Sequence, residues 1–285
     1  MSRGQAARFA ERTAFERHYV KHLSENANPV AILAFNATPP VKRKFPAGAR
    51  GAYRADGHYI VAPARFEAMP DGAIWVGVFA HEMGHAIDLH GRPADQGGRS
   101  IWLAPAIRRD RDRIGERWVA ARSRVAGEGR EMPEFPPAAH ACLLALIADR
   151  REARRVARQW RAGRMEEALA ALIRARRGAP AGRSPACDPR LQIYGFAVVG
   201  AFIGAVYDLA RGSGPPRAYY RRFRHLGTPT LTIAHAAEAF ANAYVADVLE
   251  GTELLSFLVR TAAPHTHAAY RVLLARIAAR HDGAT

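Results

Sequence analysis

Two histidines four residues apart are the strongest chemical signal in this sequence. His81 and His85 flank Glu82 in the run HEMGH, which matches the pattern H-E-x-x-H. Residues four apart lie on one face of a helix, so both imidazoles can bind a single zinc ion. Zinc polarises a carbonyl and lowers the pKa of bound water from about 16 towards 7, so Glu82 can accept a proton as the water attacks. The motif therefore predicts one catalytic zinc with Glu82 as the general base.

The residues around the motif favour this interpretation. HEMGH follows VGVFA, so two histidines and a glutamate enter an apolar helix. Such an arrangement costs free energy unless something pairs the polar groups, and zinc explains it better than a purely structural role. Gly84 costs about 1 kcal/mol relative to alanine in a helix interior, which indicates a close crossing by another helix.

A catalytic zinc needs a third protein ligand and an open fourth position. The metzincin pattern would require a glycine at 88 and a histidine at 91, whereas this chain has Asp88 and Gly91. That class is disfavoured, so the third ligand must come from a distant part of the chain. Glu238, Asp208 and His235 are the candidates, and the residues alone leave the choice among them open.

Two short blocks, residues 78–90 and 236–245, resemble a known family. HEMGHAID is similar to the HExGHxxD signature of gluzincin metallopeptidases related to the anthrax lethal factor catalytic domain, and EAFANAY resembles their ligand helix. The resemblance implies Glu238 as the third zinc ligand, with Asn242 hydrogen-bonded to an imidazole. In lethal factor itself the ligand lies one turn earlier, where this chain has Ala234, so Glu238 is carried over from other gluzincins.

The run AVYDLARGSGPPRAYY at 205–220 is similar to a segment that precedes the ligand helix in phage-borne and toxin-associated metallopeptidases. By this resemblance Tyr219 or Tyr220 donates a hydrogen bond to the tetrahedral oxyanion. The alternative is two packing tyrosines in a basic loop. Asp88 follows His85 by three residues and can orient an imidazole or the active-site loop, unless it is an ordinary surface aspartate.

The elements that must position these residues follow from periodicity and turn signals. We expect an opening helix at 3–24, a buried strand at 30–35, a hairpin at 51–63 around Asp56-Gly57, and a buried helix at 73–89. Residues 107–178 are helical and contain 18 arginines and 10 acidic residues, with a break at 127–137. They can form a projecting helical arm, although solvated faces of packed helices are favoured.

A linker is predicted at 176–189, followed by an apolar helix at 193–207 and helices at about 232–249 and 268–280. Gly200 lies on a small-residue face of the apolar helix, where another helix can approach closely. At 15 residues, this segment is shorter than the ~20 that span a membrane, so we expect no transmembrane segment.

These elements predict a predominantly α, α+β fold of the zincin type. A small sheet within 30–63 packs on the HEMGH helix, and the helical C-terminal half supplies Glu238. We divide one catalytic domain into an N-terminal part (1–91), a basic helical insertion or arm (92–180) and a C-terminal part (181–285). An extended peptide pairing with an edge strand would present its carbonyl to zinc, so the predicted function is a metalloendopeptidase acting on a protein or peptide.

Charge and cysteine content bear on partners and location. The chain has 42 Lys+Arg against 26 Asp+Glu, a net charge of +16 that favours acidic partners. Nucleic acid is a less favoured partner, because no recognition motif is visible. The alternative function is a zinc-containing, non-proteolytic structural or nucleic-acid-associated protein that uses the basic arm. With only Cys142 and Cys187 and no apolar leader, we expect a cytoplasmic protein or export by a leaderless route.

Overall fold

The structure is a computed structural model. It describes residues 14–38, 41–44, 52–54, 58–61, 73–90, 97–122, 134–147, 149–177, 189–208, 215, 217–249 and 254–282. Helices dominate these residues, and the strands are short. The predicted class, α+β and predominantly α, is confirmed at this level.

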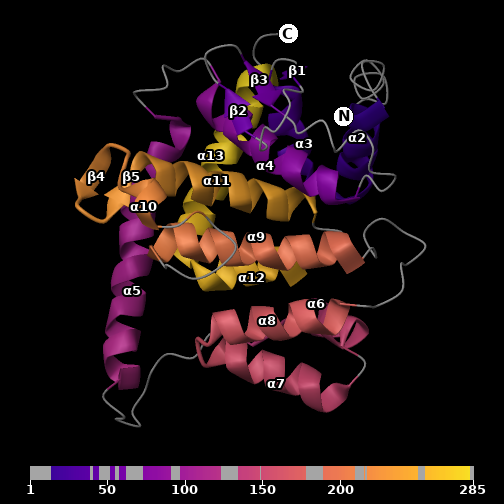
Figure 1. The fold of residues 1–285 in the computed structure, drawn as a ribbon, viewed down its shortest axis with the longest axis vertical. Coiled ribbons are helices and arrows are strands. Elements are labelled where there is room, and N and C mark those ends of the chain that lie inside the picture. The colour runs from indigo at the N-terminus through magenta and orange to yellow at the C-terminus, as the bar shows by residue number, and fades with distance from the viewer. Residues whose placement is uncertain are drawn as a thin grey trace.

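A stack of three long helices forms the centre of the molecule (Figure 1). Helix α11 (Ile233–Val248) packs on α4 (Ala73–Leu89) on one side and on α9 (Pro189–Tyr207) on the other. Nearly every residue of α11 is buried, as expected for a helix surrounded by others. The predicted helices at 73–89 and 232–249 match α4 and α11 within a residue.

A small sheet lies beside α4. Its strand order is β1 (Lys42–Lys44), β3 (Tyr59–Val61), β2 (Ala52–Arg54), with β1 parallel and β2 antiparallel to β3. The predicted hairpin is present as β2 and β3, while its turn residues 55–57 lie outside the described residues. Strand β2 is an edge of the sheet and contacts α4, so the sheet packs on this helix.

The predicted strand at 30–35 is wrong, because these residues belong to helix α3 (Pro29–Asn36). Asn28 caps this helix by accepting a hydrogen bond from the Val30 backbone nitrogen at 3.1 Å, and Pro29 occupies its first turn. Asn followed by Pro is a helix-start signal. A short continuous apolar run does not by itself distinguish a buried strand from a buried helix.

Helices at both chain ends complete the layer around α4 and α11. Helix α2 (Ala14–Asn26) contacts α4, and the earlier part of the predicted opening helix, residues 3–13, lies outside the described residues. The C-terminal helix α13 (Pro264–Asp282) is longer than the predicted 268–280 and packs against α3 and α5.

The later helices of the arginine-rich segment form a further layer below α9, whereas α5 runs beside the stack (Figure 1). After α5 (Ala104–Arg122) come α6 (Pro137–Leu146), α7 (Arg150–Arg161) and α8 (Met165–Arg176). Helix α8 packs on α9, and α6 packs on α12 (Leu254–Ala262). These three helices therefore pack on one another and on the rest of the protein. Most of the predicted break at 127–137 and of the linker at 176–189 lies outside the described residues.

Four small elements were not predicted from the sequence. A 3-10 helix, η3 (Arg99–Leu103), follows α4, and a short helix, α10 (Arg217–Tyr220), leads to the hairpin of β4 (His225–Thr228) and β5 (Leu231–Thr232). Strand β5 runs directly into α11. These elements thus follow the C-terminal end of α4 and precede the start of α11, the two helices that carry the candidate ligands.

Helix α9 is the one described helix that is long and apolar enough to cross a membrane, and 61% of its residues 190–207 are buried inside the protein. It packs between α8, α11 and α12, which is the position of a core helix. The predicted close approach at Gly200 is absent, since a Cβ there would meet only the Leu169 side chain at 3.8 Å. Glycine is therefore not required sterically at this position.

The close crossing predicted at Gly84 is confirmed. A Cβ on Gly84 would lie 2.8 Å from the Cα atom of Ala241 and 3.2 Å from its Cβ atom. Real Cβ atoms are essentially never that close to backbone, and a helix backbone cannot yield as a flexible side chain can. Glycine on α4 and alanine on α11 thus let the two helices cross at short range.

We expect Gly84→Ala to lower the free energy of unfolding by about 1–3 kcal/mol through overpacking at this crossing. Gly200→Ala is the matched control. It removes a glycine from the interior of α9, where the added methyl group fits, so stability should stay equal or rise by up to about 1 kcal/mol. Urea denaturation of both variants with a chelator present measures the difference, and equal stabilities would contradict the steric argument.

Candidate metal centre

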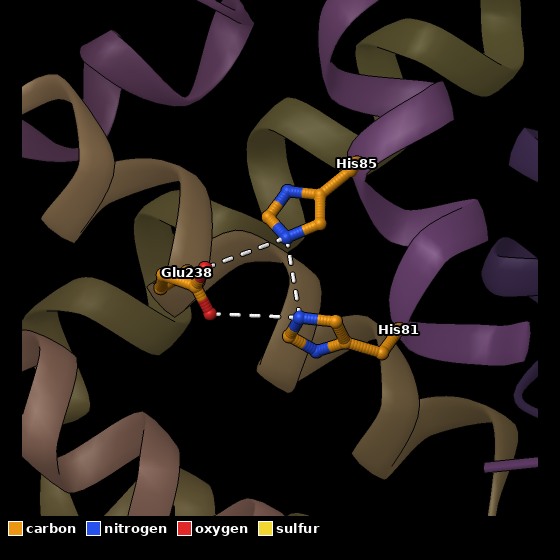
Figure 2. Close-up of side chains that lie close together, drawn as sticks. All are labelled: His81, His85 and Glu238. Atoms are coloured by element: carbon orange, nitrogen blue, oxygen red, sulfur yellow. Dashed lines mark hydrogen bonds and ion pairs between the residues drawn. The ribbon is translucent and has the colours of Figure 1, made fainter. Parts of the chain in front are cut away.

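The side chains of His81, His85 and Glu238 converge between α4 and α11 (Figure 2). The two imidazole Nε2 atoms are 3.2 Å apart. One carboxylate oxygen of Glu238 lies 3.5 Å from Nε2 of His81, and the other lies 3.7 Å from Nε2 of His85. All three ligating atoms are within 4.8 Å of one another, so these residues can hold a metal ion.

The spacing fits a tetrahedral ion. Metal–ligand bonds of about 2.0–2.1 Å place the corners of a tetrahedron roughly 3.3 Å apart. The observed separations of 3.2, 3.5 and 3.7 Å are close to that value before any adjustment of the side chains. Two imidazole nitrogens and one carboxylate occupy three corners and leave the fourth for water or substrate.

Glu238 is held in a buried position by its two histidine partners. Its residue exposure is only 6%. Burial acts to raise the pKa of this carboxyl group, but the hydrogen bond with His85 and the positive charge of the two imidazoles outweigh burial and lower the pKa overall. Glu238 is therefore an anion, as a metal ligand must be.

The pKa values of the two imidazoles shift in opposite directions, although both side chains are partly buried. Burial lowers the pKa of His81, and the Glu238 carboxylate only partly offsets this effect. Burial also acts to lower the pKa of His85, but hydrogen bonding and attraction to Glu238 dominate and raise it to about 9. In the metal-free protein a proton on His85 thus neutralises the carboxylate.

Asn242 lies where the sequence placed it, one turn beyond Glu238. Its residue is 2% exposed, and its amide nitrogen donates to the backbone oxygen of Glu238 at 2.8 Å. The side chain also lies near His81 and acts to raise its pKa. Because the amide nitrogen is used by the backbone, the amide oxygen is the atom suited to accept from the imidazole. That bond would direct Nε2 of His81 towards the metal.

Asp88 is fully buried, which excludes an ordinary surface aspartate. Its carboxylate accepts hydrogen bonds from the backbone nitrogen and hydroxyl of Ser100, at 2.5 and 2.6 Å. Arg99 donates to the backbone oxygen of Ile87 at 2.9 Å. The 99–100 segment therefore holds the C-terminal end of α4. Asp88 also attracts the His85 imidazole electrostatically.

Glu82 lies beside the ligand group and touches the sheet. It is 7% exposed, and its carboxylate accepts a hydrogen bond from the backbone nitrogen of Tyr53 at 2.6 Å. Its negative charge acts on both His81 and His85. The candidate base is thus fixed between the metal ligands and edge strand β2. Tyr53 was not singled out from the sequence, although the predicted hairpin contained it.

The two adjacent tyrosines of α10 point to different places. The Tyr219 hydroxyl lies near the Glu238 carboxylate, and the two groups shift each other's pKa. Tyr220 is buried and stacks on the His235 ring, with ring centroids 3.9 Å apart and planes at 14°. The pKa of the Glu238 carboxyl group is lowered by Tyr219, whereas the Tyr220 ring packs on the cap of α11.

The two rival ligands contact each other instead of the imidazole pair. Nε2 of His235 lies 3.4 Å from a carboxylate oxygen of Asp208. The other ring nitrogen of His235 accepts from the backbone nitrogen of Thr232 at 3.1 Å, as part of the cap of α11. Among the described residues, the only group of three or more ligating side chains is the one containing Glu238.

Tyr194 was missed by the sequence analysis. Its ring packs against Gly77 on α4, one turn before His81, where a Cβ would collide with it. Burial raises its pKa, and the charges of Glu82 and Glu238 raise it further, so the phenol lies near both carboxylates. The sequence signal was weak, since a tyrosine in the apolar run IYGFAVVGAF is typical of core packing.

Comparisons of this chain with protein-family models, with curated proteins and with solved structures found no match. The resemblance to gluzincins therefore rests on the two short sequence blocks, residues 78–90 and 236–245. What the structure adds is the proximity of their polar residues, His81, His85 and Glu238, across more than 150 residues of intervening chain.

We expect metal binding to weaken as the pH falls. With its pKa raised to about 9, His85 carries a proton at pH 7 that a divalent ion must displace. Below pH 9 this residue alone should weaken apparent affinity about tenfold per pH unit. Calorimetric titration with zinc at pH 7, in buffers of different ionisation enthalpy, should show about one proton released per ion. A binding enthalpy independent of the buffer would contradict this protonation state.

Proposed function

We propose that this protein is a zinc-dependent metallopeptidase that hydrolyses peptide bonds in a protein or peptide substrate. The observation that carries the proposal is the convergence of His81, His85 and Glu238 at nearly tetrahedral spacing, with the Glu82 carboxylate beside them. Two imidazoles and one carboxylate with an open fourth position are a donor set typical of catalytic zinc in peptidases. When bound, zinc supplies Lewis-acid polarisation and a lowered pKa of water.

Glu82 is the general base in this proposal. Its contact with the Tyr53 backbone nitrogen restrains the carboxylate, so that its position relative to the ligands is set before substrate arrives. The carboxylate accepts a proton from the attacking water and then delivers it to the leaving amine. The same contact ties the base to strand β2.

Strand β2 is the element on which an extended substrate would bind. It is an edge of the three-stranded sheet and lies against α4. A peptide that adds to such an edge is aligned by main-chain hydrogen bonds, which do not depend on its sequence. Its scissile carbonyl would be delivered next to Glu82, because Tyr53 of this strand already contacts that side chain. The net charge of +16 favours acidic substrates.

Tyr219 is the proposed donor to the oxyanion that develops on the scissile carbonyl. Its hydroxyl lies near the Glu238 carboxylate, and its raised pKa keeps it protonated throughout the physiological range. Burial is the main cause of that shift, and the charges of Glu238 and Glu82 add to it. A neutral hydroxyl is a donor that stabilises negative charge without a competing anion.

We expect Glu82→Gln to lower peptidase activity by at least about 100-fold, because the amide cannot accept the proton from water. Zinc content should stay near one ion per chain, since Glu82 is not a ligand. The measurement is hydrolysis of a denatured protein with zinc added, together with metal analysis of the purified variant.

Two further variants test the ligand set in the same preparation. Glu238→Ala should lose zinc, whereas Asp208→Ala should keep it, because Asp208 contacts His235 and Arg217 rather than the imidazole pair. Zinc retained by the glutamate variant and lost by the aspartate variant would overturn the ligand assignment. Full activity of Glu82→Gln would exclude the proposed base, and zinc binding without cleavage by the wild-type chain would favour a scaffold.

The paired tyrosines provide a matched test of oxyanion stabilisation. Tyr219→Phe should lower kcat by about 100-fold, the effect of losing one donor to an oxyanion. Tyr220→Phe should change kcat far less, since that ring stacks on His235 and its hydroxyl has no hydrogen-bond partner among the described residues. Steady-state kinetics of both variants at equal zinc content decides the matter. Equal losses would show that the pair acts through packing.

A further inference from the structure

Helix α7 presents an arginine-rich face to solvent. The side of the helix with Ala153, Val156 and Trp160 is completely buried. The opposite side carries Arg150, Arg151, Arg154 and Arg158, all of which are exposed. Arg150, Arg154 and Arg158 are spaced four residues apart, so they follow one another along the helix at a rise of about 6 Å per step.

These arginines differ from their neighbours in having no acidic partner. Arg155, Arg161 and Arg164 each form an ion pair, with Glu152, Glu134 and Glu167 respectively. Within the described ranges, no carboxylate lies within ion-pair distance of Arg150, Arg151, Arg154 or Arg158. Their positive charge is therefore not neutralised locally.

The arginine row of α7 begins at the open end of a helical hairpin, where further arginines lie. The short connection at 162–164 makes α7 and α8 antiparallel, so the C-terminal end of α8 lies beside the start of α7. That end adds the exposed Arg174 and Arg177. The acidic residues Glu166 and Glu167 are at the opposite, closed end. Of the described carboxylates at the open end, Asp149 caps α7 by accepting from the Arg151 backbone nitrogen at 2.8 Å, and Glu152 pairs with Arg155.

We propose that the arginine row of α7, together with the open end of the α7–α8 hairpin, binds the phosphate backbone of double-stranded nucleic acid without reading its sequence. Duplex DNA carries one negative charge per about 1.7 Å of its axis, so the roughly 12 Å from Arg150 to Arg158 faces several phosphates. Guanidinium groups are suited to phosphate oxygens because they donate two parallel hydrogen bonds. The exposed side of α7 has no aromatic residue that could stack on bases.

The packing of α7 favours nucleic acid over an anionic membrane. An interfacial helix binds lipid by burying its apolar face among the acyl chains. The apolar face of α7 is already buried within the protein, and the Trp160 ring nitrogen donates to the Thr261 hydroxyl at 2.9 Å. Only the charged side is available, and a linear polyanion is the partner that such a rigid row matches best.

This proposal is independent of the peptidase proposal, because none of the arginines belongs to the metal centre. The experiment is fluorescence-anisotropy titration of a labelled 20-base-pair DNA duplex of arbitrary sequence with the full chain, over a series of salt concentrations. The test variant combines Arg150→Gln, Arg154→Gln and Arg158→Gln. The Glu82→Gln variant can be titrated in the same way, so the measured DNA binding does not depend on whether the chain is a peptidase.

We expect the wild-type chain to bind the duplex with a strong salt dependence, and the α7 variant to bind at least tenfold more weakly. The slope of log K against log salt should become less negative by about 3, close to one per removed phosphate contact. The matched control removes the same charge elsewhere, by Arg109→Gln, Arg222→Gln and Arg276→Gln, three exposed arginines outside this hairpin. Its affinity and slope should change far less.

Several results would overturn the proposal. One is no duplex binding by the wild-type chain near physiological salt, and another is an unchanged slope in the α7 variant. Equal losses in the α7 and control variants would show a general effect of net charge. Tighter binding to phosphatidylserine vesicles than to the duplex, lost in the α7 variant, would assign the face to membranes. Unchanged circular dichroism and zinc content in both variants confirm that folding is intact.

Discussion

The close crossing of α4 and α11 is the constraint on which the metal centre depends. The carboxylate of Glu238 can reach the two imidazoles only because Gly84 and Ala241 let the helix backbones approach without intervening side chains. The crossing also buries a charged group and two imidazoles in the interior, which is unfavourable unless they neutralise one another. In the metal-free protein a proton on His85 does so, and a divalent ion would do so more completely.

The surroundings of this crossing hold both helices at their ends. At the end of α4, Asp88 binds Ser100 and Arg99 binds the last backbone carbonyls. At the start of α11, His235 completes a capping box with Thr232. Side chains that resemble ligands by type, such as Asp88 and His235, thus serve to fix the helices that carry the ligands. Such support is what gives a site its precision.

The sequence predicted those parts of the structure that local signals determine. Helix α4 has a glycine and proline after its end and α11 has a threonine before its start, and both were placed within a residue. The strand at 30–35 failed because a continuous apolar run fits a buried helix equally well. His81, Glu82 and His85 were recognisable because one motif contains them all. Glu238 was identified from a resemblance, since no local rule connects residues that far apart.

The contacts that the sequence could not predict are those made between distant elements. The bond from the Tyr53 backbone to Glu82 depends on where the sheet packs on α4. The place of Tyr194 depends on a glycine, Gly77, on a different helix. Tyr219 and Tyr220 are adjacent and chemically identical, so only the packing of α10 against α11 separates their roles. Tyr53, Tyr194 and Tyr219 are all of a residue type that usually serves packing. They become candidate site residues only because the fold brings them near Glu82 or Glu238.

Charged groups occur in two separate places in this molecule, the site between α4 and α11 and the solvent-exposed faces of the helices. At the centre, the Glu238 carboxylate lies within 3.7 Å of both imidazoles, and a proton on His85 balances its charge in the metal-free protein. On the surface, the exposed arginines of α7 lie opposite its buried apolar face, in contact with solvent. Burying such charge would require a partner for every guanidinium, whereas exposing it costs little and leaves a field that attracts polyanions. The arginine-rich composition is therefore compatible with a stable core. The spacing of the exposed arginines then determines which polyanion fits the surface.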